Sequence, residues 1–203
     1  MEISDFQLDT LKEIINIGVG KSASSFNKIL DKKVSLQVPV IDVITYDKVK
    51  FKVGNHLKNK LSIVKMEFDG DLTGLCELVF PVEGAVEIVR ILTNESSLSN
   101  GLNDQLKTNT LSEIGNMILN ALIGTLGNLL KTRIRYSIPK YFECISEEII
   151  NDINPINKHV IYAETLFKIV NEDISGSFIL FLEVDSFDKL LGMLSNYVNN
   201  YSA

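Results

Sequence analysis

One pattern of residues occurs twice in this chain, at an interval of one hundred positions. The pattern is Glu-x-x-Asn, followed by twenty-two residues and then a proline. The two copies are Glu13, Asn16 and Pro39, and Glu113, Asn116 and Pro139. A match of a sequence to itself at a fixed interval indicates a repeated structural unit. The repeat therefore constrains the fold more than any other feature of the chain.

Each copy of the pattern is expected to lie on a helix. Asp9, Glu13 and Asn16 are spaced i, i+4 and i+7, so they fall within about 60° of one another around a helix. The opposite side holds apolar or small residues, namely Leu11, Ile14, Ile15, Gly18, Ser22, Phe26 and Ile29. In the second copy Glu113 and Asn116 lie opposite Leu111, Ile114, Ile118 and Leu122. The pattern predicts one buried face and one face that presents a carboxylate and a carboxamide to solvent.

An ordinary solvated helix face is the alternative explanation for either pair taken alone. The Glu/Asn pair is, however, repeated in register, each time with a proline at the same distance, and this repetition argues for a shared role. The Gly20-Lys21-Ser22 run resembles the end of a phosphate-binding loop, but Ile15 stands where that loop needs its first glycine. We therefore do not expect a nucleotide site there.

The composition is that of a globular protein. The chain has 203 residues, of which 45% are hydrophobic and 23% charged. The net charge of −6 and the absence of a basic stripe argue against nucleic acid or a membrane surface as a partner. The most apolar window, residues 117–130, is too short to cross a bilayer, and no signal peptide is recognisable. We therefore expect a cytoplasmic protein without membrane insertion.

The cysteines and histidines predict no special chemistry. Cys76 and Cys144 are isolated and far apart in the sequence, which is typical of reduced, buried thiols. His56 and His159 have no nearby cysteine or histidine, so zinc-site spacing is absent. We expect no metal site.

The two halves show the same predicted order of elements: long helix, strand, variable segment, hairpin, helix. The first half has a helix at 4–30, strands at 34–40, 61–69 and 74–80, and a helix at 82–92. The second has a helix at 106–131, strands at 133–138, 160–170 and 176–184, and a helix at 186–197. Residues 41–60 and 140–157 are the variable segments, and 94–103 form a linker.

Local signals add detail to this order. Ser4 or Asp5 is expected to cap the first helix, and Ser186 the last. Pro39 is expected to end its strand or to lie at a sheet edge. The two hairpin turns are expected at 69–71 and 171–176, and Asp71-Leu-Thr-Gly74 corresponds to Asp173-Ile-Ser-Gly176. Gly18 and Gly20 are costly inside a helix and indicate that another backbone comes close.

The repeat also predicts how the halves combine. One half alone would leave an apolar helix face and one face of a sheet uncovered, whereas two halves related by a pseudo-twofold axis can cover both. We predict an α+β fold, a two-layer sandwich of helices and an antiparallel sheet. It would form one domain over residues 1–203, made of repeat 1 (about 1–97) and repeat 2 (about 98–200). An internal twofold makes dimerisation less necessary, so we expect a monomer.

The pattern Asp-x-x-x-Glu-x-x-Asn, twenty-two residues and then Pro resembles the signature of the CheC/CheX/FliY family of bacterial chemotaxis phosphatases. The first copy fits it at Asp9, Glu13, Asn16 and Pro39. The second departs at Asn109, where the family pattern has Asp or Ser. The resemblance spans the whole chain. Two copies of the motif on about 200 residues resemble the CheC type, and the family's repeated α/β arrangement is implied.

The resemblance implies a hydrolase of two-component signalling. Its substrate would be phosphorylated CheY, a response regulator that carries an aspartyl phosphate. Asn16 and Asn116 would place the attacking water, while Glu13 and Glu113 would pair with a cation beside the phosphate and dock the two proteins. Supporting positions would be Asp9, Pro39, Asn109 and Pro139. No cofactor of its own is expected, and Mg²⁺ would be held by the receiver. We expect both sites to be active, although Asn109 in the second copy carries no charge.

Two other functions stay open at this point. A non-catalytic adaptor could bind phosphorylated CheY, or the receptor deamidase CheD, through the same surface, with CheD contacting the closing helix of one half. A structural protein would use the repeat for its fold alone. An Asn16→Ala/Asn116→Ala variant that binds the receiver without turnover would favour catalysis by the parent protein.

Overall fold

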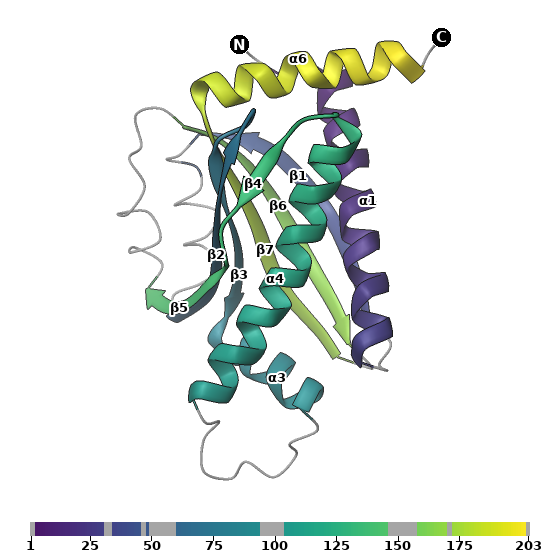
Figure 1. Ribbon diagram of the computed structural model, residues 1–203. Helices are drawn as coiled ribbons and strands as arrows, with labels where there is room; N and C mark the ends of the chain where they lie inside the picture. The colour runs from purple at the N-terminus through teal and green to yellow at the C-terminus, as the bar shows by residue number, and fades with distance from the viewer. Residues whose placement is uncertain are drawn as a thin grey trace.

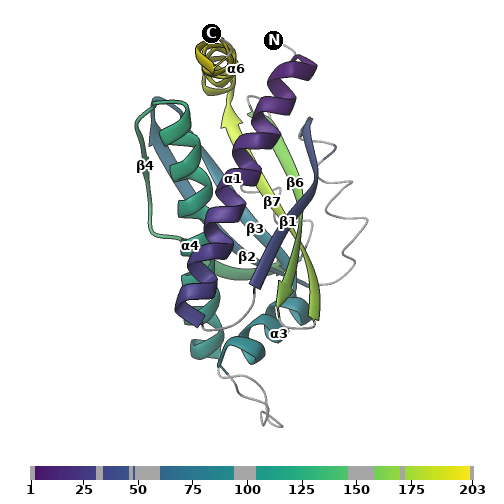
Figure 2. The same ribbon diagram turned by 90° about the vertical axis from the view of Figure 1, so that its right-hand side faces the viewer.

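The computed structural model describes residues 3–30, 34–45, 48, 60–93, 104–145, 158–169 and 172–201. Within these ranges it contains a seven-stranded antiparallel sheet. Two long helices lie side by side against one face of the sheet (Figure 1), and the side view shows both on the same side (Figure 2). The predicted α+β class is confirmed.

The elements follow the predicted order in both halves. The first half comprises α1 (Asp5–Leu30), β1 (Val34–Ile44), β2 (Lys60–Gly70), β3 (Gly74–Pro81) and α3 (Val82–Thr93). The second comprises α4 (Asp104–Leu129), β4 (Ile134–Tyr136), β5 (Lys140–Ile145), β6 (Lys158–Ile169), β7 (Glu172–Glu183) and α6 (Val184–Tyr201). The predicted linker, residues 94–103, lies outside the described residues, so the division into two repeats stays a prediction.

The sheet joins the two halves by exchanging their edge strands. Its order is β1-β6-β7-β3-β2-β4, and β5 also pairs with β2. Strand β1 therefore pairs with β6 of the second half, while β4 and β5 pair with β2 of the first half. In the centre, β3 pairs with β7. This arrangement is consistent with the predicted twofold relation.

Helices α1 and α4 pack antiparallel through small residues. A Cβ atom at Gly18 would lie 3.1 Å from the Cα of Leu122. The buried Ser22 hydroxyl lies 3.5 Å from the carbonyl oxygen of Ile118, to which it donates. The predicted close approach at Gly18 is confirmed. At Gly20 it is wrong, because a Cβ atom there would meet nothing within 4 Å.

The predicted apolar faces of both long helices are buried wherever their side chains are described, and Phe26 and Ile29 of α1 lie outside that part. Leu11, Ile14 and Ile15 of α1 join one core with Leu111, Ile114, Ile118 and Leu122 of α4 and with alternate residues of the sheet. A second cluster lies on the other face of the sheet, and its described members all come from strands. The helices are thereby fixed in rotation, which leaves their polar stripes outside. Cys76 and Cys144 are buried free thiols, as predicted.

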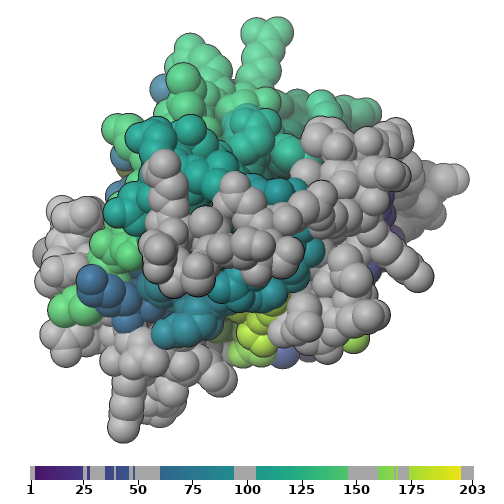
Figure 3. Space-filling view, turned by 90° about the horizontal axis from the view of Figure 1, so that it is seen from below, coloured from purple at the N-terminus to yellow at the C-terminus, as the bar shows by residue number. Residues whose placement is uncertain are grey.

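The other two helices close the ends of the sandwich. Helix α6 crosses the end at which both termini lie (Figure 1), and Gln7 of α1 donates to the carbonyl of Leu191 and the hydroxyl of Ser195 there. At the opposite end α3 and the first turns of α4 lie together (Figure 3). The closing helices therefore hold the ends of α1 and α4.

Both motif prolines lie where an edge strand departs from regular pairing. In β1 the register with β6 shifts between Gln37 and Val40, which leaves Pro39 outside the ladder. In the second half the strand is interrupted between Tyr136 and Lys140. A proline cannot donate to a ladder and is tolerated at edges and bulges, so the edge position predicted for Pro39 is confirmed.

Of the two predicted helix caps, one is confirmed and the other is wrong. Ser4 is the cap of α1, since its hydroxyl accepts from the amide of Gln7 and Gln7 Oε1 accepts from the amide of Ser4. Ser186 is not a cap, because α6 begins at Val184, and its hydroxyl instead accepts from the amide of Thr73.

The strand predictions differ from the structure at four places. Strand β1 continues past Pro39 to Ile44, and β5 lies in a stretch predicted to be irregular. The second hairpin turns earlier than expected, because β7 begins at Glu172, which pairs with Ile169, so the predicted turn at 171–176 is wrong. The first hairpin turns later than the expected 69–71, because β2 extends to Gly70 and residues 71–73 join it to β3.

Candidate functional site

The first polar stripe faces solvent along α1. Asp9, Glu13 and Asn16 are all exposed. The Nζ atom of Lys12 lies 3.3 Å from Oδ1 of Asp9, an exposed ion pair. Neither Glu13 nor Asn16 has a hydrogen bond or ion pair within the described part of the chain. Their side chains are therefore available to a partner.

The second stripe, on α4, presents the same residue types but is more ordered. Asn109 and Glu113 are exposed, and Asn116 is half-buried. Oδ1 of Asn109 accepts a hydrogen bond from Gln105 at 3.0 Å. Oδ1 of Asn116 accepts one from Nδ2 of Asn120 at 2.7 Å. The structure thus places every predicted site residue of the two helices on a solvent-facing stripe. The motif amide has a different environment on each of the two stripes.

The chemistry available to either stripe is that of one carboxylate and one carboxamide, one helical turn apart. A carboxamide can donate and accept hydrogen bonds without titrating, so it can orient a water molecule at any ordinary pH. Among the described residues there is no group of three or more metal-ligating side chains. The stripes are therefore suited to binding and positioning a reacting group that another molecule brings.

A partly buried network anchors the start of α4. Nζ of Lys107 lies 2.7 Å from Oε1 of Glu143 on β5, and the Tyr141 hydroxyl also donates to Glu143 at 2.7 Å. Burial opposes the charge of Glu143, but the hydrogen bonds from Lys107 and Tyr141 outweigh it, so its pKa is lowered. The same network raises the pKa of Lys107 against the opposing effect of burial. These contacts fix α4 to the edge of the sheet.

The two motif prolines lie at the edges of the sheet and not on the helices that carry the polar stripes. Pro139 is buried, and Pro39 lies at the bulge of β1. Pro39 lies within the edge strand β1, and Pro139 lies between β4 and β5. Their positions agree with a supporting role, which stays a prediction.

Comparisons with known proteins match both the motif and the fold. A model of the CheC-like family matches residues 6–42, which include the first motif and its proline. The CheY-P phosphatase CheC of Bacillus subtilis (strain 168) is 26% identical over 197 residues, 93% of each chain. The chain is thus similar to a CheC-like family model over its first motif and to a curated CheC over most of its length. The resemblance proposed from the repeated motif is confirmed.

Solved structures share the fold of this chain. FliY of Thermotoga maritima superposes with a TM-score of 0.76 at 22% identity, covering 97% of this chain and 100% of that one. CheX in its complex with CheY, BeF₃ and Mg²⁺ from Borrelia burgdorferi superposes with a TM-score of 0.53 at 16% identity, covering 84% and 98%. These likenesses show the architecture.

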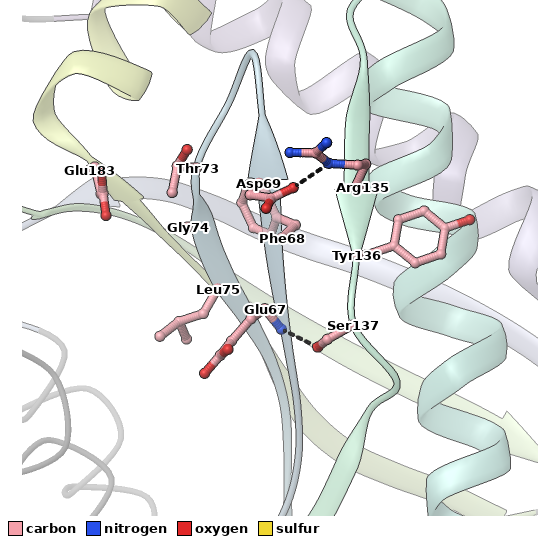
Figure 4. A pocket seen from close by; sticks show the side chains of 10 residues that line it. All are labelled: Glu67, Phe68, Asp69, Thr73, Gly74, Leu75, Arg135, Tyr136, Ser137 and Glu183. Atoms are coloured by element: carbon pink, nitrogen blue, oxygen red, sulfur yellow. Dashed lines mark hydrogen bonds and ion pairs between the residues drawn. The ribbon is translucent and has the colours of Figure 1, made fainter.

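The structure also contains a depression that the sequence did not predict. It has a volume of about 590 Å³ and is lined by residues of β2, Thr73, β3, the segment 135–137 and the end of β7 (Figure 4). Arg135 Nε lies 2.8 Å from Oδ1 of Asp69, its partner on the neighbouring strand, with both side chains largely exposed. The depression holds none of the predicted site residues. Only strand pairing brings its lining together, so no local pattern could have revealed it.

Helix α4 holds one further polar residue that the motif does not include. Asn120 stands four residues after Asn116, inside the most apolar window of the sequence, residues 117–130. Its i, i+4 spacing was the available signal, because it continues the stripe of Glu113 and Asn116 by one turn.

Proposed function

We propose that this chain is a phosphatase that removes the aspartyl phosphate of a CheY-type response regulator in the cytoplasm. The observation that carries the proposal is the solvent-facing Glu/Asn pair, present on α1 and again on the adjacent α4. The name of the Bacillus subtilis relative supports the substrate, and the CheX–CheY complex supports a receiver domain as the partner of this fold.

The reaction is a hydrolysis in which the enzyme positions the water. The oxygen of a water molecule attacks the phosphorus atom, and the bond between phosphorus and the aspartate oxygen breaks. The aspartate leaves as a carboxylate, inorganic phosphate is released, and the proton passes to solvent. Asn16 or Asn116 accepts a hydrogen bond from the water and aligns it with the scissile bond. Such positioning is the main contribution a protein makes to phosphoryl transfer.

The receiver supplies the remaining groups. Its Mg²⁺ balances the charge on the phosphoryl oxygens, so this chain needs no metal of its own. Glu13 and Glu113 are exposed and each lies one turn before an amide. They pair with a cation of the receiver beside the phosphate, which places the amide over the phosphorus. Because the chain itself carries a net charge of −6, recognition of an acidic receiver rests on these local contacts.

The test is the rate at which phosphate is lost from a pre-phosphorylated CheY-type receiver with increasing amounts of this protein. We expect saturable acceleration above the receiver's own rate. A Glu13→Gln/Glu113→Gln variant should need a higher concentration for half-saturation. The matched control, Glu83→Gln/Glu183→Gln, removes the same charge from two exposed residues of other elements and should behave as the parent.

Two outcomes would separate the enzyme from its alternatives. Binding of the phosphorylated receiver without any acceleration would make the chain an adaptor, with phosphorylated CheY or CheD as its partner. Absence of both binding and acceleration would contradict the proposed function altogether.

A further inference from the structure

The two motif amides differ in what holds them. Oδ1 of Asn116 accepts a hydrogen bond of 2.7 Å from Nδ2 of Asn120, four residues later on α4. The corresponding residue of α1 is Gly20, which has no side chain to offer. The side chain of Asn16 makes no hydrogen bond with any described residue. One motif amide is therefore held by a neighbouring side chain, and the other is not.

The surroundings of Asn120 indicate that its amide group serves this contact. Its side chain is half-buried between the stripe and the apolar window of α4. Its own Oδ1 is buried and has no hydrogen-bond partner in the described structure. A buried carbonyl oxygen without a donor is unfavourable, so stability alone would favour an apolar residue here. The NH₂ group of Asn120, by contrast, donates a hydrogen bond to Asn116, the residue proposed to align water.

We propose that Asn120 is a positioning residue for Asn116 and that it makes the α4 site the faster of two unequal sites. This inference rests on the proposed function. A carbonyl oxygen has two acceptor positions, so Oδ1 of Asn116 keeps one for the water while Asn120 occupies the other. The second hydrogen bond fixes the orientation of the amide before the receiver docks. The α1 site must order Asn16 during each encounter.

Preorganisation of this kind acts on the chemical step. A reacting group held in the correct geometry does not lose rotational freedom in the transition state, and small misplacements reduce rates severely. We expect loss of the Asn120 contact to lower the rate at saturating receiver about tenfold at the α4 site. The half-saturating concentration should stay the same, because docking depends on Glu113.

The structure allows the contact to be transplanted. Gly20 is exposed, and a Cβ atom built there meets nothing within 4 Å. An asparagine at this position would stand four residues after Asn16, in the relation that Asn120 has to Asn116. Gly20→Asn should therefore raise the rate of the α1 site, and Gly20→Ala, which restores helix propensity without an amide, should not.

The experiment measures phosphate loss from the phosphorylated receiver with one site active at a time. In an Asn16→Ala background, Asn120→Ala should lower the saturated rate about tenfold without changing half-saturation. In an Asn116→Ala background the same Asn120→Ala change should have no effect, because no amide remains to be oriented. In that second background Gly20→Asn should accelerate the reaction.

A second readout follows the hydrogen bond itself. In the NMR spectrum of the unmodified chain, the side-chain NH₂ hydrogens of Asn120 should exchange slowly with solvent, and Asn116→Ala should abolish that protection. Unfolding midpoints of all variants identify any change that acts through stability alone.

The outcomes distinguish this inference from the proposed function. Acceleration by the parent protein with an unchanged saturated rate in Asn16→Ala/Asn120→Ala would overturn the role of Asn120 and leave the phosphatase intact. An inactive Asn16→Ala variant would also overturn the role of Asn120, because it would mean that the α1 site alone is active in the parent protein. No acceleration by the parent protein would overturn both.

Discussion

Replacement of Gly115 by alanine should destabilise the protein, although alanine favours helices. Gly115 precedes Asn116 and faces β2. A Cβ atom on it would overlap Cγ1 of Val64 and lie 2.7 Å from the Cβ of Val64. Val64 is 1% exposed, and rotation of its side chain does not move its Cβ. Helix α4 would therefore have to shift away from the sheet, together with the second stripe.

The magnitude follows from two opposing effects. Overpacking a buried site costs about 1–3 kcal/mol and more where a backbone must move. Replacing a glycine by alanine in a helix interior raises the free energy of unfolding by about 1 kcal/mol. Because the overlap involves an atom fixed to the backbone, we expect the upper end of the cost and a net loss of about 2 kcal/mol.

The assay is urea unfolding, with Gly124→Ala as the matched control on the same helix. A Cβ atom at Gly124 meets nothing within 4 Å, so that variant should gain up to about 1 kcal/mol. With a urea dependence of about 2–3 kcal/mol per molar, the two midpoints should differ by about 1 M. Val64→Ala should remove only the part of the Gly115→Ala penalty that comes from the Cγ atoms, because the Cβ atom 2.7 Å away remains, as a double-mutant cycle would measure. A Gly115→Ala variant as stable as Gly124→Ala would refute the packing described for α4.

Three further perturbations have defined outcomes. Lys107→Met should lower stability at neutral pH. The pKa of Glu143 is lowered in the folded state, so its ion pair stabilises the protein fully above the unfolded pKa of about 4.3. This stabilisation is lost as the pH falls through the folded pKa. The unfolding midpoints of the parent and the variant should therefore converge below about pH 4. Burial, and next the nearby Glu77, raise the pKa of the Cys76 thiol, so a thiol reagent should modify it only at the rate of global unfolding, as mass spectrometry can follow. Arg135→Ala should change the unfolding midpoint little, because its ion pair with Asp69 is largely exposed and such pairs contribute about 0–1 kcal/mol.

The helices were predictable because their signal is local. The 3.6-residue period places Leu11 and Ile14 inside and Glu13 and Asn16 outside, and the structure agrees. The fold class followed from the repeat, since each half leaves faces that only the other half can cover.

The sheet edges and the second amide were harder to predict. Strand β5 was missed because its pairing with β2 is non-local and it follows an interruption at Pro139. Asn120 was passed over because the surrounding window is apolar, and its role depends on where the side chain of Asn116 turns. The depression beside Arg135 depends wholly on strand pairing, so sequence patterns carry no signal for it.

In the proposed function, the solvent-facing amides of α1 and α4 direct water onto a phosphoryl group held by a receiver. The most direct measurement is the saturated rate of phosphate loss with Asn16→Ala/Asn116→Ala, alongside binding of the phosphorylated receiver. The account predicts that the rate falls to the receiver's own value while binding is retained. A double variant that still accelerates hydrolysis as the parent protein does would contradict it.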